Sequence, residues 1–168
     1  IITVEDPVEY RLSGINQVQV HEKIDLSFAR VLRSALRQDP DVVLVGEMRD
    51  QETVEIGLRA AMTGHMVFST LHTQDAVSTV SRLLDMGTQG YLIASALDGI
   101  LAQRLLRRLC DNCAHSVVPG VHQLAWLSRY LTAEQIASTK FAEGMGCTYC
   151  NMTGYRGRVG VYELLEID

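Results

Sequence analysis

Four cysteines in two closely spaced pairs give the clearest chemical signal in this sequence. The pairs are Cys110 with Cys113 and Cys147 with Cys150, and two residues separate the thiols of each pair. This spacing lets both thiolates of a pair face one ion, and two pairs complete the tetrahedron that zinc prefers. The alternatives are two disulfides or four free thiols. The sequence shows no secretory leader, which weakens the case for disulfides because these form mainly in oxidising compartments. We therefore expect one structural zinc ion, with no coordination position left open for catalysis.

Polar and charged residues follow three apolar runs of the sequence, at the point where each run ends. Glu47 follows the run Val42–Val45, Glu5 follows the N-terminal run, and His72 follows the run that begins at Met66. Strand ends in an α/β sheet share the edge at which ligands bind. A carboxylate there can hold Mg²⁺ through water or orient an attacking water. Each signal alone is weak, because many strands end in Glu and a lone histidine is more often only hydrogen-bonded, but their convergence indicates one site.

The elements that would position these residues alternate between strand and helix. Strands are predicted from β-branched and apolar runs at residues 1–4, 42–45 and 66–70, and from alternating apolar and polar residues at 15–20. Helices are predicted from apolar residues at helical spacing at residues 28–38, 52–63, 76–86 and 92–109. The alternation indicates an α/β fold with a parallel sheet, and the unbroken apolar runs of the third and fourth strands predict burial on both faces.

The character of the sequence changes at the first cysteine, and a strand pattern returns only at Arg158–Leu165. We therefore expect three parts. They are an α/β core over residues 1–109, an inserted tetracysteine module over 110–150, and a return strand of the core within 151–168.

Composition restricts the class of protein. Hydrophobic residues make up 47% of the 168 residues and charged residues 21%, with three prolines, which is typical of a globular chain. The net charge of −5 argues against non-specific binding to nucleic acid, which needs a basic face. The sequence begins in an apolar run, without an initiating methionine or the pattern of a signal peptide, so we interpret it as part of a larger protein. It contains neither a G-x-x-x-x-G-K-[ST] loop nor a G-x-G-x-x-G motif.

Four stretches together resemble the secretion-ATPase superfamily, the assembly ATPases of type II secretion and type IV pili. Ile2–Tyr10 resembles the aspartate box of that family, Leu36–Asp50 its atypical Walker B segment, and Gly64–Thr73 its histidine box. The paired cysteines, followed by Gly154–Glu163, resemble the extension ATPases rather than the retraction ATPases, which lack the cysteines.

The resemblance implies a fragment of a RecA-like core that forms a ring of six subunits and hydrolyses Mg²⁺-ATP between subunits. It implies a protein of the bacterial cytoplasm, peripheral at the inner membrane, with an inner-membrane platform protein and a cytoplasmic assembly protein as partners. Glu47 and Glu5 would share water activation and Mg²⁺ coordination, and His72 would sense the phosphates. The Walker A loop would lie upstream of Ile1, so we expect this chain alone to be inactive.

Three arginines are candidates to reach a neighbouring subunit's site, and salt bridges within the subunit are the alternative for each. They are Arg37, Arg49 and Arg59. Two further functions stay open: a zinc-stabilised interaction module without hydrolysis, and a degenerate ring subunit that keeps the fold without the loop. An intact glycine-rich loop upstream in the parent protein would exclude both.

Overall fold

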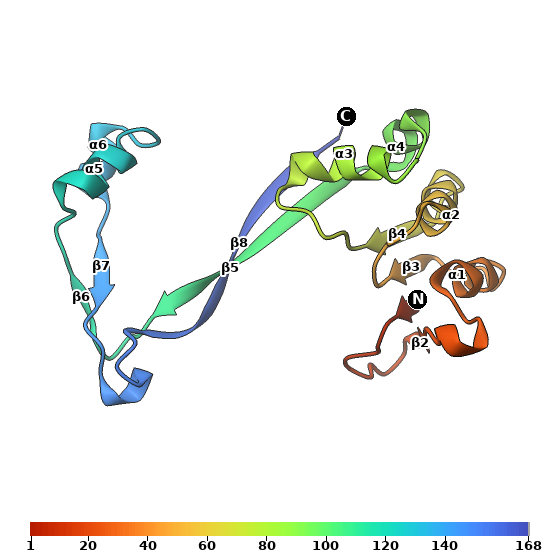
Figure 1. Cartoon of the computed structure of the whole chain (residues 1–168), viewed down its shortest axis with the longest axis horizontal. Helices are drawn as coiled ribbons and strands as arrows, with labels where there is room; N and C mark the ends of the chain where they lie inside the picture. The colour runs from red at the N-terminus through yellow and green to blue at the C-terminus, as the bar shows by residue number, and fades with distance from the viewer. Residues whose placement is uncertain (168) are drawn as a thin grey trace. The chain divides into compact units, whose positions relative to one another are not determined.

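The computed structural model describes residues 1–167 and contains two compact units. The first unit comprises Ile1–Gln103 together with the chain from Tyr162 onward, and the second comprises Arg104–Val161. Figure 1 labels the helices and strands of each. Within the described residues, no helix is long and apolar enough to cross a bilayer.

A parallel sheet of four strands forms the centre of the first unit, which confirms the predicted α/β class. The strands are β1 (Ile2–Glu5), β2 (Asn16–Gln19), β3 (Val42–Val45) and β4 (Met66–Ser69). They lie in the order β2-β1-β3-β4, and all three neighbouring pairs are parallel. The carboxyl ends of β1, β3 and β4 therefore meet at one edge of the sheet.

Helices follow the strands, and most begin at a side chain that caps them. The helices of this unit are α1 (Phe28–Leu36), α2 (Gln51–Met62), α3 (Ala76–Asp85) and α4 (Gly90–Ala96), with a short 3₁₀ turn η1 (Glu22–Ile24) before α1. Ser27 accepts a hydrogen bond from the Arg30 amide at the start of α1, and Asp50 accepts one from the Thr53 amide at the start of α2. Such caps satisfy amides that have no partner within the helix.

The core lies between one face of the sheet and the helices α1 and α2, which contact each other. Val4, Val43 and Val45 are fully buried there, together with Leu32 of α1. A second cluster, around Val54 of α2, joins this helix to α3 and α4. Both clusters follow from apolar residues that recur at strand or helix spacing.

The opposite face of the sheet is open, so the prediction that β3 and β4 are buried on both faces is wrong. Leu44 is 36% exposed, Met66 57% and Phe68 52%. The physical reason is that α1 and α2 pack on a single face (Figure 1), and no described helix covers the other. An unbroken apolar run indicates that burial on both faces would stabilise a strand, but it does not show that a helix is present to cover each face.

The predicted helix over residues 92–109 is also wrong. The chain is helical only to Ala96 and then forms the strand β5 (Gly99–Leu109), which pairs with β8 (Tyr155–Glu166). The Ile167 amide donates to the Asp98 carbonyl at 3.1 Å, which marks one end of an antiparallel ribbon. The leucines and arginines of β5 have good helix propensity, and the long-range pairing with β8 overrides it. The predicted return strand at 158–165 is confirmed as part of β8.

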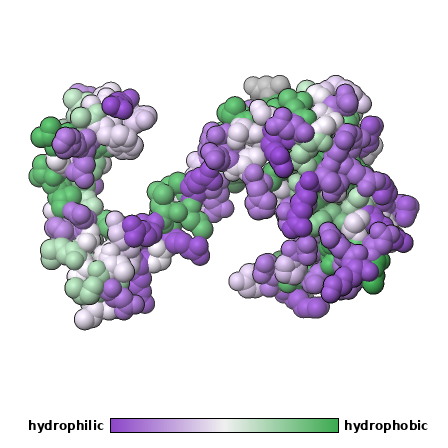
Figure 2. Space-filling view, viewed as in Figure 1, coloured by the Kyte–Doolittle hydropathy of each residue, from purple (hydrophilic) through white to green (hydrophobic). Residues whose placement is uncertain are grey.

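The second unit has little apolar core of its own. The short strands β6 (Ala114–Ser116) and β7 (Ala142–Gly144) pair antiparallel, with α5 (Val121–Leu127) and α6 (Ala133–Ser138) between them and the 3₁₀ turn η2 (Thr148–Cys150) after them. Neither α5 nor α6 contains a buried residue. Apolar residues of this unit remain at its surface (Figure 2), as at Val118, which is 91% exposed. Its order must therefore depend on something besides hydrophobic burial.

Candidate functional site

Glu47 lies just beyond the carboxyl end of β3, and its carboxylate has a partner on each oxygen. Arg49 Nη2 donates to Glu47 Oε1 at 2.5 Å, and His72 Nε2 lies 3.5 Å from Glu47 Oε2. The Glu47 side chain is 16% exposed, whereas that of His72 is 91% exposed. Arg49 Nη1 also lies 3.6 Å from Asp6 Oδ2, so the segments after β1, β3 and β4 all contribute to this cluster.

The cluster keeps Glu47 ionised. The hydrogen bond from Arg49 is the main cause that lowers the pKa of the Glu47 carboxyl below its ordinary value, and the charge of Arg49 and the contact with His72 act in the same direction. The same hydrogen bond raises the pKa of the Arg49 guanidinium. An ionised, half-enclosed carboxylate at a ligand-binding edge can accept a proton or hold a cation.

The backbone at Gly46 brings the ends of the strands close together. The Gly46 amide donates to the Val4 carbonyl at 2.7 Å, and Thr70 Oγ1 donates to the Gly46 carbonyl at 2.6 Å. A Cβ at Gly46 would lie 3.1 Å from the Val4 carbonyl oxygen and 3.3 Å from Glu5 Cα, which are backbone atoms that cannot easily move. Because glycine has no Cβ, the chain can pass close to the end of β1 at this point, and Glu47 follows where the ends of β1, β3 and β4 converge.

Glu5 lies at the same sheet edge but has a different set of partners. Its Oε1 accepts from Thr3 Oγ1 at 2.5 Å and from Gln17 Nε2 at 2.9 Å. Among the described residues, no hydrogen bond or ion pair joins Glu5 to Glu47 or His72. Of the three predicted site residues, the structure brings Glu47 and His72 together. The Glu5 side chain is instead hydrogen-bonded to Thr3 on its own strand and to Gln17 on β2.

Sequence reasoning assigned no partner to Arg49, although a signal was present. Arg49 is two residues from Glu47, a spacing at which side chains of an extended segment point the same way. Within this chain Arg49 pairs with Glu47 and Asp6. The other candidate arginines have local partners, since Arg59 lies 3.9 Å from Glu55 and Arg37 donates to Ser34 Oγ at 3.5 Å.

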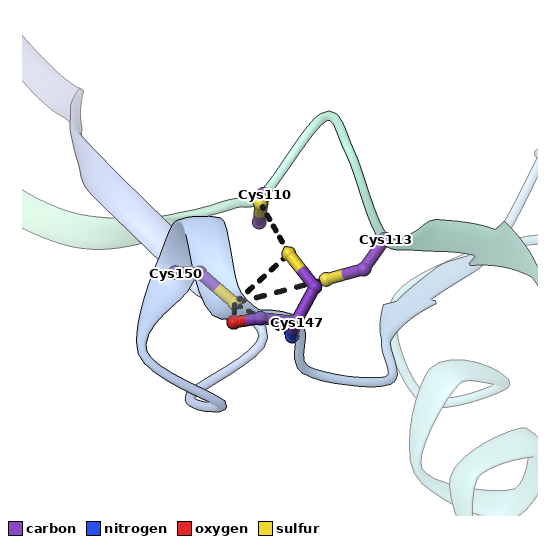
Figure 3. Close-up of side chains that lie close together, drawn as sticks. All are labelled: Cys110, Cys113, Cys147 and Cys150. Carbon is purple, nitrogen blue, oxygen red and sulfur yellow. Dashed lines mark hydrogen bonds between the residues drawn. The ribbon is translucent and has the colours of Figure 1, made fainter.

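The four cysteines gather at one point of the second unit (Figure 3). The Sγ atoms of Cys110 and Cys147 are 3.9 Å apart, those of Cys113 and Cys150 3.8 Å, and those of Cys147 and Cys150 3.7 Å. Ligands on a tetrahedron with zinc–sulfur bonds of ~2.3 Å would be about 3.8 Å apart. The spacing of the sulfurs and their soft donor chemistry therefore fit a zinc ion.

Backbone amides direct hydrogen bonds to the cysteine sulfurs. The amides of Cys147 and Gly154 donate to Cys150 Sγ at 3.2 and 3.3 Å. Although burial opposes them, these hydrogen bonds lower the pKa of the Cys150 thiol to about 6, whereas burial raises that of Cys113. The backbone hydrogen bonds therefore favour the thiolate form of Cys150, which is the form in which cysteine binds a metal ion.

A family model described as "Type II/IV secretion system protein" matches residues 1–168. The chain belongs to this family. The match confirms the resemblance on which the aspartate, Walker B and histidine boxes were assigned. The chain is 51% identical to the type II secretion system protein E of Dickeya dadantii over 174 aligned residues, which cover 100% of this chain and 32% of that relative.

Two further relatives are named as pilus proteins. It is 52% identical to the type IV pilus assembly ATPase PilB of Myxococcus xanthus, over 98% of this chain and 29% of that relative. The crystal structure of the pilus retraction motor PilT with bound ADP superposes with a TM-score of 0.65 at 36% identity, covering 100% of this chain and 38% of that one. The chain thus spans about a third of the length of these relatives.

Proposed function

We propose that this chain is the C-terminal part of the ATPase domain of a protein that powers type II secretion or type IV pilus assembly. The observation that carries the proposal is the Glu47 carboxylate, held by Arg49 and His72 beyond the end of a parallel strand. Relatives named as assembly ATPases, at about half identity over nearly the whole chain, support the assignment. In the parent protein Mg²⁺-ATP would supply the phosphoryl group that is transferred.

Glu47 is the proposed general base. Its Oε2 lies 3.5 Å from His72 Nε2, whereas Arg49 donates to Oε1 at 2.5 Å, so Oε2 is the less tightly held oxygen and the one more available to accept a proton from water. His72 is exposed and so is available to contact a phosphate, while Glu5 supplies a second carboxylate that can hold the metal ion through water. Positioning and charge neutralisation carry most of the catalysis of phosphoryl transfer, and this cluster provides part of both.

Zinc is the proposed structural metal of the second unit, held by Cys110, Cys113, Cys147 and Cys150. Four thiolates leave no open position, so the ion would contribute folding free energy and no catalytic step. This role agrees with the scarcity of buried side chains in α5 and α6.

Assembly of the parent into a homohexamer at the cytoplasmic face of the inner membrane is the proposed setting, with a platform protein and a cytoplasmic assembly protein as partners. Nucleotide would then bind between subunits. A strictly monomeric parent in the presence of Mg²⁺ and a non-hydrolysable ATP analogue would contradict this arrangement.

The test compares the parent protein, its Glu47→Gln variant and the 168-residue chain. Glutamine keeps the shape of Glu47 and removes the charge, so turnover should fall by roughly 10²-fold while nucleotide binding persists. The isolated chain lacks any phosphate-binding glycine loop in its sequence and should hydrolyse ATP negligibly. Wild-type turnover by Glu47→Gln would remove Glu47 from catalysis, and a parent without a glycine-rich loop would favour the interaction module or the degenerate subunit.

A further inference from the structure

Glu163 of β8 makes a hydrogen bond to a residue that is far from it in the sequence. Its Oε2 accepts a hydrogen bond from the amide of Ala76 at 3.1 Å, across a separation of 87 residues. Ala76 is the first residue of α3, and its amide has no partner within the helix. Asp75 caps a different amide, that of Ser78, at 2.7 Å. Two carboxylates therefore share the start of α3, where the helix dipole favours negative charge.

The first turn of α3 is tied to the loop that carries His72. The hydroxyl oxygens of Thr73 and Thr79 lie 2.8 Å apart, and Thr79 Oγ1 donates to the Asp75 carbonyl at 3.1 Å. Thr79 is buried, so this link is anchored in the protein interior. Only three residues separate His72 from Ala76. A shift of the first turn of α3 would therefore move Thr73 and, with it, its neighbour His72.

We infer that Glu163 is a positioning residue that holds His72 against Glu47 by fixing the start of α3. The His72 side chain is 91% exposed, so burial restrains it little. Its place 3.5 Å from Glu47 Oε2 depends on the backbone of its loop. The contact with Ala76 ties that loop to β8, an element distant in the sequence. This inference rests on the proposed role of Glu47 as the base.

The test uses the full-length parent with Glu163→Ala, Glu163→Gln and the control Glu166→Ala. Glu166 lies on the same strand, and no hydrogen bond or ion pair is found for it among the described residues. Amide hydrogen exchange over residues 72–80 reports on the anchor, and kcat and KM for ATP report on the site. Glu163→Ala should speed exchange and lower kcat about 10-fold with KM unchanged, since small misplacements of catalytic groups are costly. Glu163→Gln keeps an acceptor oxygen and should restore both values, and Glu166→Ala should change neither.

A double variant separates positioning from a general loss of structure. If Glu163 acts through His72, Glu163→Ala should lower kcat no further in a His72→Ala background. An equal loss of kcat in both backgrounds, or unchanged exchange over residues 72–80 in Glu163→Ala, would overturn the inference. Full turnover by Glu47→Gln would instead overturn the proposed function, and the exchange measurement would still report separately on the contact between Glu163 and Ala76.

Discussion

Arg49 controls the charge of the proposed base more strongly than any other side chain near it. Its hydrogen bond to Glu47 Oε1 at 2.5 Å is the largest cause of the lowered pKa of that carboxyl. The contact with His72 adds to the effect. A lowered pKa keeps the carboxylate deprotonated over a wide pH range, but it also makes Glu47 a weaker proton acceptor, because base catalysis follows Brønsted behaviour.

Replacing Arg49 with alanine in the parent should move the acidic limb of the pH profile. Without the hydrogen bond and the positive charge, the pKa of Glu47 rises toward its ordinary value, so the base is protonated at higher pH and kcat/KM falls earlier on acidification. Profiles of kcat/KM against pH would measure this shift. Arg30→Ala is the matched control, since Arg30 pairs with Asp25 at 2.6 Å and was not a candidate for the site. Coincident acidic limbs for the wild type and Arg49→Ala would exclude Arg49 from setting the ionisation.

Much of this site could be predicted from the sequence at the level of single residues. Glu47 and His72 each follow an apolar run that forms a strand, and the carboxyl ends of parallel strands lie at the same edge of a sheet. The distance of 3.5 Å between Glu47 Oε2 and His72 Nε2 agrees with that expectation. The partners of Glu5 could not be predicted in this way. They depend on the pairing of β1 with β2, which places Gln17 opposite Thr3 and beside Glu5.

Among the elements, β5 shows where local reasoning fails. Its residues have helix propensity and helical spacing, yet they form a strand because β8 pairs with them from the far end of the chain. Propensity contributes fractions of a kcal/mol per residue, whereas a paired ribbon satisfies a whole row of backbone groups. The four strands of the parallel sheet were predictable because β1, β3 and β4 are short apolar or β-branched runs and the segment of β2 alternates apolar with polar residues.

The junction of β1, β3 and β4 makes a prediction about Gly46. Gly46→Ala places a Cβ against the backbone of Val4 and Glu5, so the strand ends must separate, and the free energy of unfolding should fall by about 1–3 kcal/mol. Gly90→Ala is the control, because its Cβ would meet only Leu84 Cδ2 at an ordinary 3.8 Å. Denaturant titrations of both variants measure the difference. Equal midpoints would mean that the strand ends adjust without cost.

At the scale of the whole molecule, two units stabilised by different means should unfold separately. The first unit has two buried apolar clusters. The second contains the cysteine cluster, where the proposed zinc ion would contribute a binding free energy of order 10 kcal/mol. Removal of zinc should therefore affect one unit far more than the other.

A chelator, or the variant Cys147→Ser, should abolish the calorimetric transition of the second unit and leave that of the first largely unchanged. Elemental analysis of the untreated protein should give one zinc per chain. Amide exchange can confirm the location of the loss, with residues 110–150 becoming unprotected and the β1–β4 sheet remaining protected. A zinc-free protein with both transitions intact would show that the cluster needs no metal.

The placement of the cysteine cluster has a consequence for the rate of folding. The ribbon of β5 and β8 joins Asp98 to Ile167, so a long loop must close before it forms. Loop closure costs entropy that grows with length, and such long-range pairing slows folding. Cys110 follows β5 directly, and its amide donates to the Gly154 carbonyl at 3.0 Å at the start of β8. Zinc captured early by the cysteines would thus act as a temporary tether that shortens the search. Stopped-flow refolding with zinc present should then be faster than refolding without it, and equal rates would place metal capture after the ribbon has formed.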